Sequence, residues 1–253
     1  MPGEAEVIRA ILGSRPVARD GLLIVHSAFR GLSQAGLRAE SFCEALVDAM
    51  DGGTILMPTM TWRTVTPASP LFDELKTPSH TGVLSEVFRT RFATHRSLHP
   101  THSAAGRGPL SKLLLSTHHL GTTPCAGNSP YGLMREYDTH ILMLGVGLEC
   151  CTAMHHAEEM MAPDVYVQPM EDAEEYDLVD RNGVTHHVKT RRHVRRLRDF
   201  PKFEPMLKAR GMLAEGRAYD TRWILFSARE LYRVVFEALV EREDATLELA
   251  VTR

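Results

Sequence analysis

Three short apolar runs, each bordered by glycine, constrain the fold of this chain more than any other feature. They are Leu22–Val25, Thr54–Met57 and Ile141–Leu144. Runs that are apolar at every position are typical of strands buried on both faces of a parallel sheet, and parallel strands need a crossover helix between them. Residues 42–50, between the first two runs, carry apolar side chains at helical spacing. The sequence therefore predicts a βαβ unit within an α/β fold, with a central, mostly parallel sheet flanked by helices.

Length and charge narrow the class of protein. The 253 residues are 43% hydrophobic, which is enough for one large domain, so we expect residues 1–253 to form a single α/β domain. The net charge of -3 gives no global field that favours nucleic acid or an anionic membrane. Met1–Glu4 lacks the basic start of a signal peptide, and no long apolar segment follows it. We expect a cytoplasmic protein without membrane or nucleic-acid partners, and a homodimer is compatible with the sequence.

Residues 171–198 form a module of their own. An acidic run is followed by Asn182-Gly183, a strong two-residue turn signal, and then by a basic run. The pattern predicts an inserted β-hairpin in which Glu174 lies opposite Arg191, so that cross-strand pairing neutralises much of the positive charge. This argues against a nucleic-acid interface. The arginines of 195–198 lie beyond the hairpin, where they are either solvated or available to a phosphate-bearing ligand.

The C-terminal part contains the clearest helix signal. Residues 227–239 begin with capping-box spacing and continue with an apolar stripe, which predicts a helix that closes the core. The last dozen residues, 242–253, have no such pattern, and we expect a frayed tail there.

The segment Thr152–Glu159 carries the best candidate for chemistry. If it is helical, Thr152, His155 and either Glu158 or Glu159 share one face, because side chains three and four residues apart are neighbours on a helix. A histidine with a carboxylate behind it is a general base with the group that orients it. The alternative is a surface helix whose polar side chains are only solvated.

Other motifs are weaker. Cys151 and His155 lie at helical spacing, so a nucleophilic thiolate is an alternative to a packed, inert cysteine. Gly145-Val146-Gly147 begins like a dinucleotide-binding loop, but Cys150 occupies the third glycine position. The 13 histidines show no zinc-ligand spacing, so we expect no metal.

A series of motifs, in this order along the chain, resembles the aminoglycoside 3-N-acetyltransferase family. The motifs are Val25-His26-Ser27, Gly53–Thr59, Arg96–Ser103, Asn128-Ser129-Pro130, Leu142–Gly147 and Thr152-x-x-His155-x-Ala157-Glu158. The resemblance runs over most of the chain and is distinct from the common small acetyltransferase fold. It implies direct transfer of an acetyl group from acetyl-CoA to an amine of an aminoglycoside or a related small molecule.

The resemblance also implies roles for individual residues. His155 is the general base, with Thr152 and Glu158 beside it as further catalytic residues. The residues expected at the acetyl-CoA site are His26, Ser27, Ser103, Asn128 and Ser129. The residues expected to contact the amine substrate are Trp62, His99 and His102.

Because the sequence departs from the family pattern at several positions, it does not identify the amine that accepts the acetyl group. The loop after Ser27 lacks the paired glycines of many relatives, Asn128 replaces a glycine, and no acidic wall suited to a polycation is recognisable. Two alternatives remain: a metal-dependent hydrolase that uses His99, His102, His155 and Glu158, and a catalytically silent binding protein of the same fold.

Overall fold

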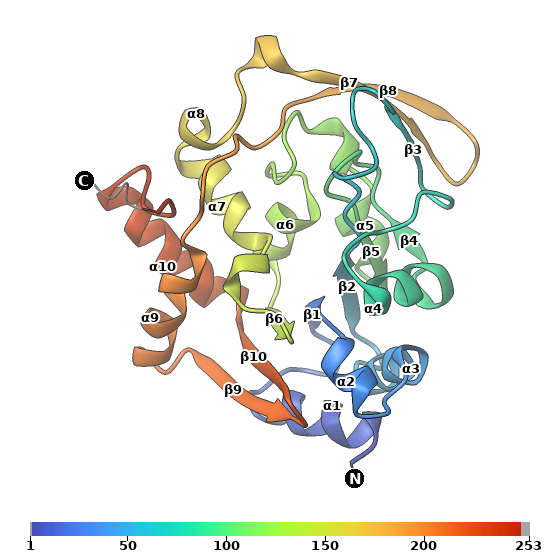
Figure 1. The fold of residues 1–253 in the computed structure, drawn as a ribbon, viewed down its shortest axis with the longest axis vertical. Coiled ribbons are helices and arrows are strands. Elements are labelled where there is room, and N and C mark those ends of the chain that lie inside the picture. The colour runs from blue at the N-terminus through green and yellow to red at the C-terminus, as the bar shows by residue number, and fades with distance from the viewer. Residues whose placement is uncertain (1, 249–253) are drawn as a thin grey trace.

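The computed structural model describes residues 2–248, which form a mixed α/β fold (Figure 1). The strands are β1 (Leu22–Ser27), β2 (Thr54–Pro58), β3 (Leu71–Asp73), β4 (His95–Arg96), β5 (Ala104–Arg107), β6 (Thr139–Leu144), β7 (Glu174–Val179), β8 (Thr185–Thr190), β9 (Leu213–Ala218) and β10 (Thr221–Ser227). The helices are α1 (Glu4–Leu12), α2 (Arg30–Gln34), α3 (Ala39–Ala49), α4 (Val83–Val87), α5 (Ser111–Leu115), α6 (Pro130–Leu133), α7 (Ala153–Met161), α8 (Pro163–Tyr166), α9 (Phe203–Ala209) and α10 (Ala228–Glu241).

The main sheet has seven strands in the order β4-β5-β2-β1-β6-β10-β9. Its centre consists of the three strands predicted from their apolar runs, and β2, β1 and β6 are parallel to one another. The strands added on each side are antiparallel to their neighbours. The predicted α/β fold with flanking helices is confirmed, and the parallel pairing is confined to the centre of the sheet.

The two faces of the sheet carry separate apolar cores. Leu22 and Ile24 of β1 face the core that contains α7, α9 and α10, while Leu23 and Val25 face the core that contains α1 and α3. Figure 1 shows these two groups of helices on opposite sides of the central strands. Because both faces are covered, the central strands have no polar face, and this explains their uninterrupted apolar sequence.

The carboxyl ends of β1, β2 and β6 meet at one edge of the sheet, since the three strands are parallel. At this edge Gly145 follows β6 with φ of 71°, a conformation that L side chains rarely adopt. A Cβ at this position would lie 2.5 Å from the Ala28 carbonyl oxygen. Glycine therefore allows the turn after β6 to approach the turn after β1, and both turns border the site described below.

The predicted hairpin is present as β7 and β8, and β3 joins it in parallel to make a smaller three-stranded sheet. The register differs from the prediction: Glu174 pairs with Thr190 rather than with Arg191. The backbone N–H of Asp180 bonds to the Val184 carbonyl, and Gly183 has φ of 81°. These contacts define a loop of residues 181–183, which is one residue longer than the predicted turn and shifts every pair by one position.

The structure also differs from the sequence prediction in the C-terminal segment. The sequence predicts fraying from residue 242 onward, but Ala245 and Leu247 are buried in the α10 core and Thr246 is fully buried. Residues 249–253 of the predicted tail lie outside the described part of the chain. No helix within residues 2–248 combines the length and the apolar composition needed to cross a bilayer.

Candidate active site

A large cleft lies at the edge of the main sheet where the parallel strands end. Its volume is about 1560 Å³, and its lining comes from both sheets and from α7. Residues His26, Ser27, Trp62, His102, Thr152 and His155 from the sequence prediction all line it. Because a typical small-molecule site occupies roughly 300–1,000 Å³, this cleft has room for two substrates.

Helix α7 presents His155 to the cleft. Its apolar residues Met154 and Ala157 are fully buried, the helix packs on α10, and it ends before Pro163, which cannot continue the hydrogen-bond ladder. His155 Nδ1 lies 2.8 Å from Glu158 Oε2, one turn along the helix. The sequence leaves Glu158 and Glu159 open as the partner of His155, and the structure pairs it with Glu158.

The surroundings of His155 keep its ring neutral. Burial and the nearby His193 lower its pKa, while Glu158 acts in the opposite direction. The His155 ring stacks on His193 with a centroid distance of 4.4 Å, and its side chain is 23% exposed. When Nδ1–H donates to the Glu158 carboxylate, the neutral ring carries its lone pair on Nε2. His155 can therefore accept a proton at Nε2.

Glu159 belongs to a different group of residues. It accepts hydrogen bonds from His193 Nε2 at 2.7 Å and from the Cys125 backbone N–H at 2.8 Å. Ligand atoms of Cys125, Glu159 and His193 lie within 4.8 Å of one another, the one group found among residues 2–248 with the spacing of a metal site. The set proposed from sequence for a metal-dependent hydrolase is therefore not brought together as ligands.

Strand β1 ends in polar atoms that have no partner. His26 Nε2 and Ser27 Oγ are buried and lack a hydrogen-bond partner within the described residues, and both side chains line the cleft. Burial lowers the pKa of His26 to about 4, so its ring is neutral. Unpaired buried polar atoms are uncommon in folded proteins, and at the border of a cleft they mark positions where a ligand would bond.

The expected substrate-contact residues divide between the cleft and the interior. Trp62 is exposed and packs edge-on against His80, with ring centroids 4.7 Å apart. His102 also lines the cleft. His99 is buried instead, and its Nδ1 accepts hydrogen bonds from two backbone N–H groups of its own loop, those of Thr101 and His102. His99 therefore shapes the loop that carries His102.

Three of the expected acetyl-CoA residues lie outside the cleft. Ser129 is fully buried and accepts a hydrogen bond from Gly132 N–H at the start of α6. Asn128 Nδ2 donates to the Thr117 carbonyl at 2.7 Å. Ser103 is fully buried and donates to the Thr59 carbonyl at 2.7 Å. The positions of these side chains give each a structural contact rather than a place in the cleft wall.

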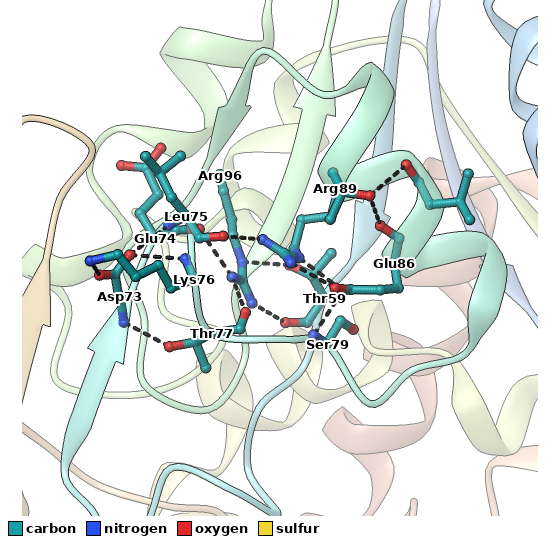
Figure 2. A network of polar contacts seen from close by, with 12 residues as sticks. Thr59, Asp73, Glu74, Leu75, Lys76, Thr77, Ser79, Glu86, Arg89 and Arg96 are labelled. Atoms are coloured by element: carbon teal, nitrogen blue, oxygen red, sulfur yellow. Dashed lines mark hydrogen bonds and ion pairs between the residues drawn. The ribbon is translucent and has the colours of Figure 1, made fainter.

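Arg96, the last residue of β4, is the centre of a network of polar contacts beside the cleft (Figure 2). Its side chain is buried, and Nη1 donates to the carbonyls of Glu74 and Thr77 at 3.1 and 2.6 Å. Nη2 donates to the Thr59 carbonyl at 3.1 Å. Burial lowers the Arg96 pKa to about 9. These bonds join segment 73–81, which supplies His80 and Thr81 to the cleft, to the end of β2.

The sequence did not indicate that Arg96 joins segment 73–81 to the end of β2. It also did not indicate several residues of the cleft wall. These are Arg63, His80, Glu149, Arg192 and His193. They come from loops and from the segment after β8, which runs past α7 (Figure 1). The Val194 N–H donates to the Tyr166 carbonyl at 2.9 Å and places this segment beside α8. No local pattern in the sequence indicates such long-range contacts.

The cysteines near α7 differ in accessibility. Cys150 is exposed and lines the cleft, while Cys151 is buried. Burial raises the pKa of Cys151 to about 12, so its thiol stays protonated. A Cys151 thiolate is therefore not available to act as a nucleophile.

Comparisons with known proteins agree with this architecture. The family model described as aminoglycoside 3-N-acetyltransferase matches residues 24–240. Aminoglycoside N(3)-acetyltransferase IV from Salmonella sp is 34% identical over 158 residues, which are 62% of this chain and 59% of that protein. The match thus spans less than two thirds of the relative's length.

Solved structures show the same fold over nearly the whole chain. The aminoglycoside acetyltransferase AAC(3)-IVa superposes with a TM-score of 0.80 and 25% identity, over 98% of this chain and 92% of that one. A mutant of that enzyme has also been solved in complex with a gentamicin. AAC-IIIb with CoASH gives a TM-score of 0.77 at 21% identity, over 95% and 97% of the two chains. This chain belongs to the aminoglycoside 3-N-acetyltransferase family.

Proposed function

We propose that this protein is an acetyl-CoA-dependent N-acetyltransferase that acetylates an amine of an aminoglycoside or a related small molecule, with His155 as the general base. The observation that carries the proposal is the His155–Glu158 pair, at 2.8 Å, in which a fully buried carboxylate bonds to a partly exposed imidazole at a cleft large enough for two substrates. Membership of the family supplies the reaction class.

The residues present fit acetyl-CoA as the donor. Ser27 Oγ and His26 Nε2 offer polar atoms without partners at the end of β1. Arg195 and Arg196 are exposed on the wall of the same cleft and present guanidinium groups suited to phosphates. AAC-IIIb, a protein of the same fold, binds CoASH. When bound, acetyl-CoA would supply an acetyl thioester to this site.

The chain's own residues then have distinct tasks. His155 Nε2 accepts the proton that the amine loses as its nitrogen bonds to the acetyl carbon in place of sulfur, and His155 returns that proton to the departing thiolate. Glu158 holds the ring tautomer and stabilises the imidazolium that forms between these two steps. Ser27 is the candidate donor to the oxygen that gains negative charge, and Thr152 borders the same space at the start of α7.

A thiol-release assay with acetyl-CoA tests this function. It is run across a panel of aminoglycosides and unrelated amines, and mass spectrometry identifies the acetylated product. We expect acetyl-CoA-dependent transfer to at least one amine of the panel. Absence of transfer, together with no calorimetric binding of CoA at millimolar concentration, would contradict the proposal and favour a silent binding protein.

Arg195 and Arg196 give a separate prediction about the binding of acetyl-CoA. The double substitution Arg195→Ala/Arg196→Ala is expected to raise KM for acetyl-CoA about tenfold, because two exposed contacts with phosphate contribute about 1.4 kcal/mol together. KM for acetyl-pantetheine, which lacks the nucleotide phosphates, should stay unchanged. Arg210→Ala is the matched control, since Arg210 lies outside the cleft and pairs with Glu237. Equal changes for both donors would exclude phosphate binding by these arginines.

A further inference from the structure

The segment after α10 returns to the buried side of the His155–Glu158 pair. Thr246 is fully buried, and its carbonyl accepts a hydrogen bond from Asp199 N–H at 2.8 Å. The Glu248 N–H donates to the Leu197 carbonyl at 3.1 Å, so this segment runs beside the chain that leads from β8 to α9. Thr246 lies beyond residues 24–240, the part that matches the family model.

Glu158 depends on neighbouring donors because its side chain is completely buried. Oε2 bonds to His155, and Oε1 accepts from the Thr246 hydroxyl and, at 3.4 Å, from Arg198 Nε. A buried carboxylate is costly unless hydrogen bonds replace its lost water. Of the two groups that reach Oε1, the Thr246 hydroxyl is the nearer. Burial acts to raise the Glu158 pKa, but His155, Arg198 and Thr246 together hold it below its usual value.

The direction of the Thr246–Glu158 hydrogen bond follows from the number of protons available. The Thr246 hydroxyl has one proton, and the Glu158 carboxylate can only accept, so that proton points to Glu158. Thr246 Oγ1 also lies 2.8 Å from Tyr166 Oη, so the same hydroxyl contacts both Glu158 and Tyr166. The Thr246 hydroxyl thus lies behind Glu158, and Glu158 in turn accepts from His155.

We propose that Thr246 is a positioning residue for this reaction: its hydroxyl fixes the Glu158 carboxylate, and through it the tautomer and orientation of His155. The inference rests on the proposed function, in which His155 is the general base. A role in packing alone would need only the shape of the side chain, which valine shares. The hydroxyl proton is the feature that distinguishes positioning from packing.

The substitution Thr246→Val tests the proposal because it keeps the shape and removes the donor. We expect kcat to fall about tenfold, because Glu158 loses its nearest donor at Oε1 and a lost hydrogen bond to a charged group has an effect of this order, with KM for acetyl-CoA unchanged. The acid limb of the pH profile should move to higher pH, since a carboxylate with fewer donors increases the proton affinity of the His155–Glu158 pair. Thr246→Ser restores the hydroxyl and should restore both kcat and the acid limb.

Thr139→Val is the matched control. Thr139 is also buried, and its hydroxyl donates to the Met134 carbonyl at 2.7 Å, at the opposite end of β6 from the cleft. The Thr139→Val substitution should lower the melting temperature but leave the pH profile of kcat unchanged. A Thr246→Val protein with parental kcat and pH profile would overturn the proposal, as would a loss that serine does not restore.

A titration of the His155 ring by NMR gives a readout that does not depend on activity. The expected result is a higher pKa of His155 in Thr246→Val than in the parent, and the same value in Thr246→Ser as in the parent. Equal values in all three proteins would reject the role of Thr246. If the parent transfers no acetyl group, the proposed function fails, but this titration still decides whether Thr246 controls the pair.

Discussion

Replacing His155 with alanine or glutamine is expected to remove most acetyl transfer while CoA binding is retained. In the proposed mechanism the lost group accepts the proton of the amine, and removal of a general base typically costs about two to four powers of ten in rate. Turnover is measured by thiol release, and CoA binding by calorimetry. In the parent, the rate should fall at acid pH with a midpoint below pH ~6.5, the usual pKa of histidine. The reason is that burial and His193 lower the pKa of His155.

His156→Gln is the control on the same helix. His156 is buried, does not line the cleft, and bonds through Nδ1 to the Cys125 carbonyl at 2.6 Å. This substitution should lower stability and leave kcat within a few-fold of the parent. If the His156 variant lost turnover and the His155 variant kept it, the assignment of the base would be wrong.

Replacing Arg96 with methionine is expected to cause the largest loss of stability among the substitutions discussed. Methionine approximates the side-chain length but leaves the carbonyls of Glu74, Thr77 and Thr59 without their charged donor. Since hydrogen bonds to charged groups contribute about 1.5–3 kcal/mol each, we expect a loss of about 3 kcal/mol or more. A domain of this size should then melt about 6–12 °C lower, as measured by calorimetry.

Arg91→Met serves as the control for loss of an arginine from the same region. Arg91 is 59% exposed and pairs with Glu40 at the surface, where such pairs contribute about 0–1 kcal/mol. Its melting temperature should stay close to that of the parent. Arg96→Lys should recover little of the loss, because one ammonium cannot reach carbonyls that a planar guanidinium contacts on several sides. A similar melting temperature for the Arg96 and Arg91 variants would contradict the account of Arg96 as the link between segment 73–81 and β2.

Local patterns predicted the elements whose neighbours are close in sequence or whose burial is uniform. The apolar runs of β1, β2 and β6 identified the buried centre of the sheet, because strands covered on both faces carry apolar side chains at successive positions. The spacing within α7 placed His155 and Glu158 on one face, since side chains three residues apart on a helix are neighbours. The order of motifs along the chain identified the family.

Local patterns failed where one residue or one distant contact decides the outcome. Asn182-Gly183 does lie in the turn of the hairpin. The Asp180–Val184 hydrogen bond, however, closes a loop of three residues rather than two, and the register of the hairpin is therefore shifted by one position. The family resemblance implies that Ser103 and Asn128 lie at the acetyl-CoA site, which stays a prediction, and the structure shows that their side chains bond to nearby backbone carbonyls. A motif whose residues lie in loops does not indicate where each side chain points, because no regular period fixes its direction.

The sequence by itself determined the α/β class, the helix that carries the candidate base and the family of the protein, because each of these depends on periodicity or on the order of motifs. Only the tertiary structure decided which carboxylate bonds to His155, that Arg96 joins segment 73–81 to the end of β2, and that Thr246 reaches Glu158 across 88 positions of sequence. Such contacts depend on how segments that are distant in sequence pack together, and this packing produces no periodic pattern in the sequence of those segments.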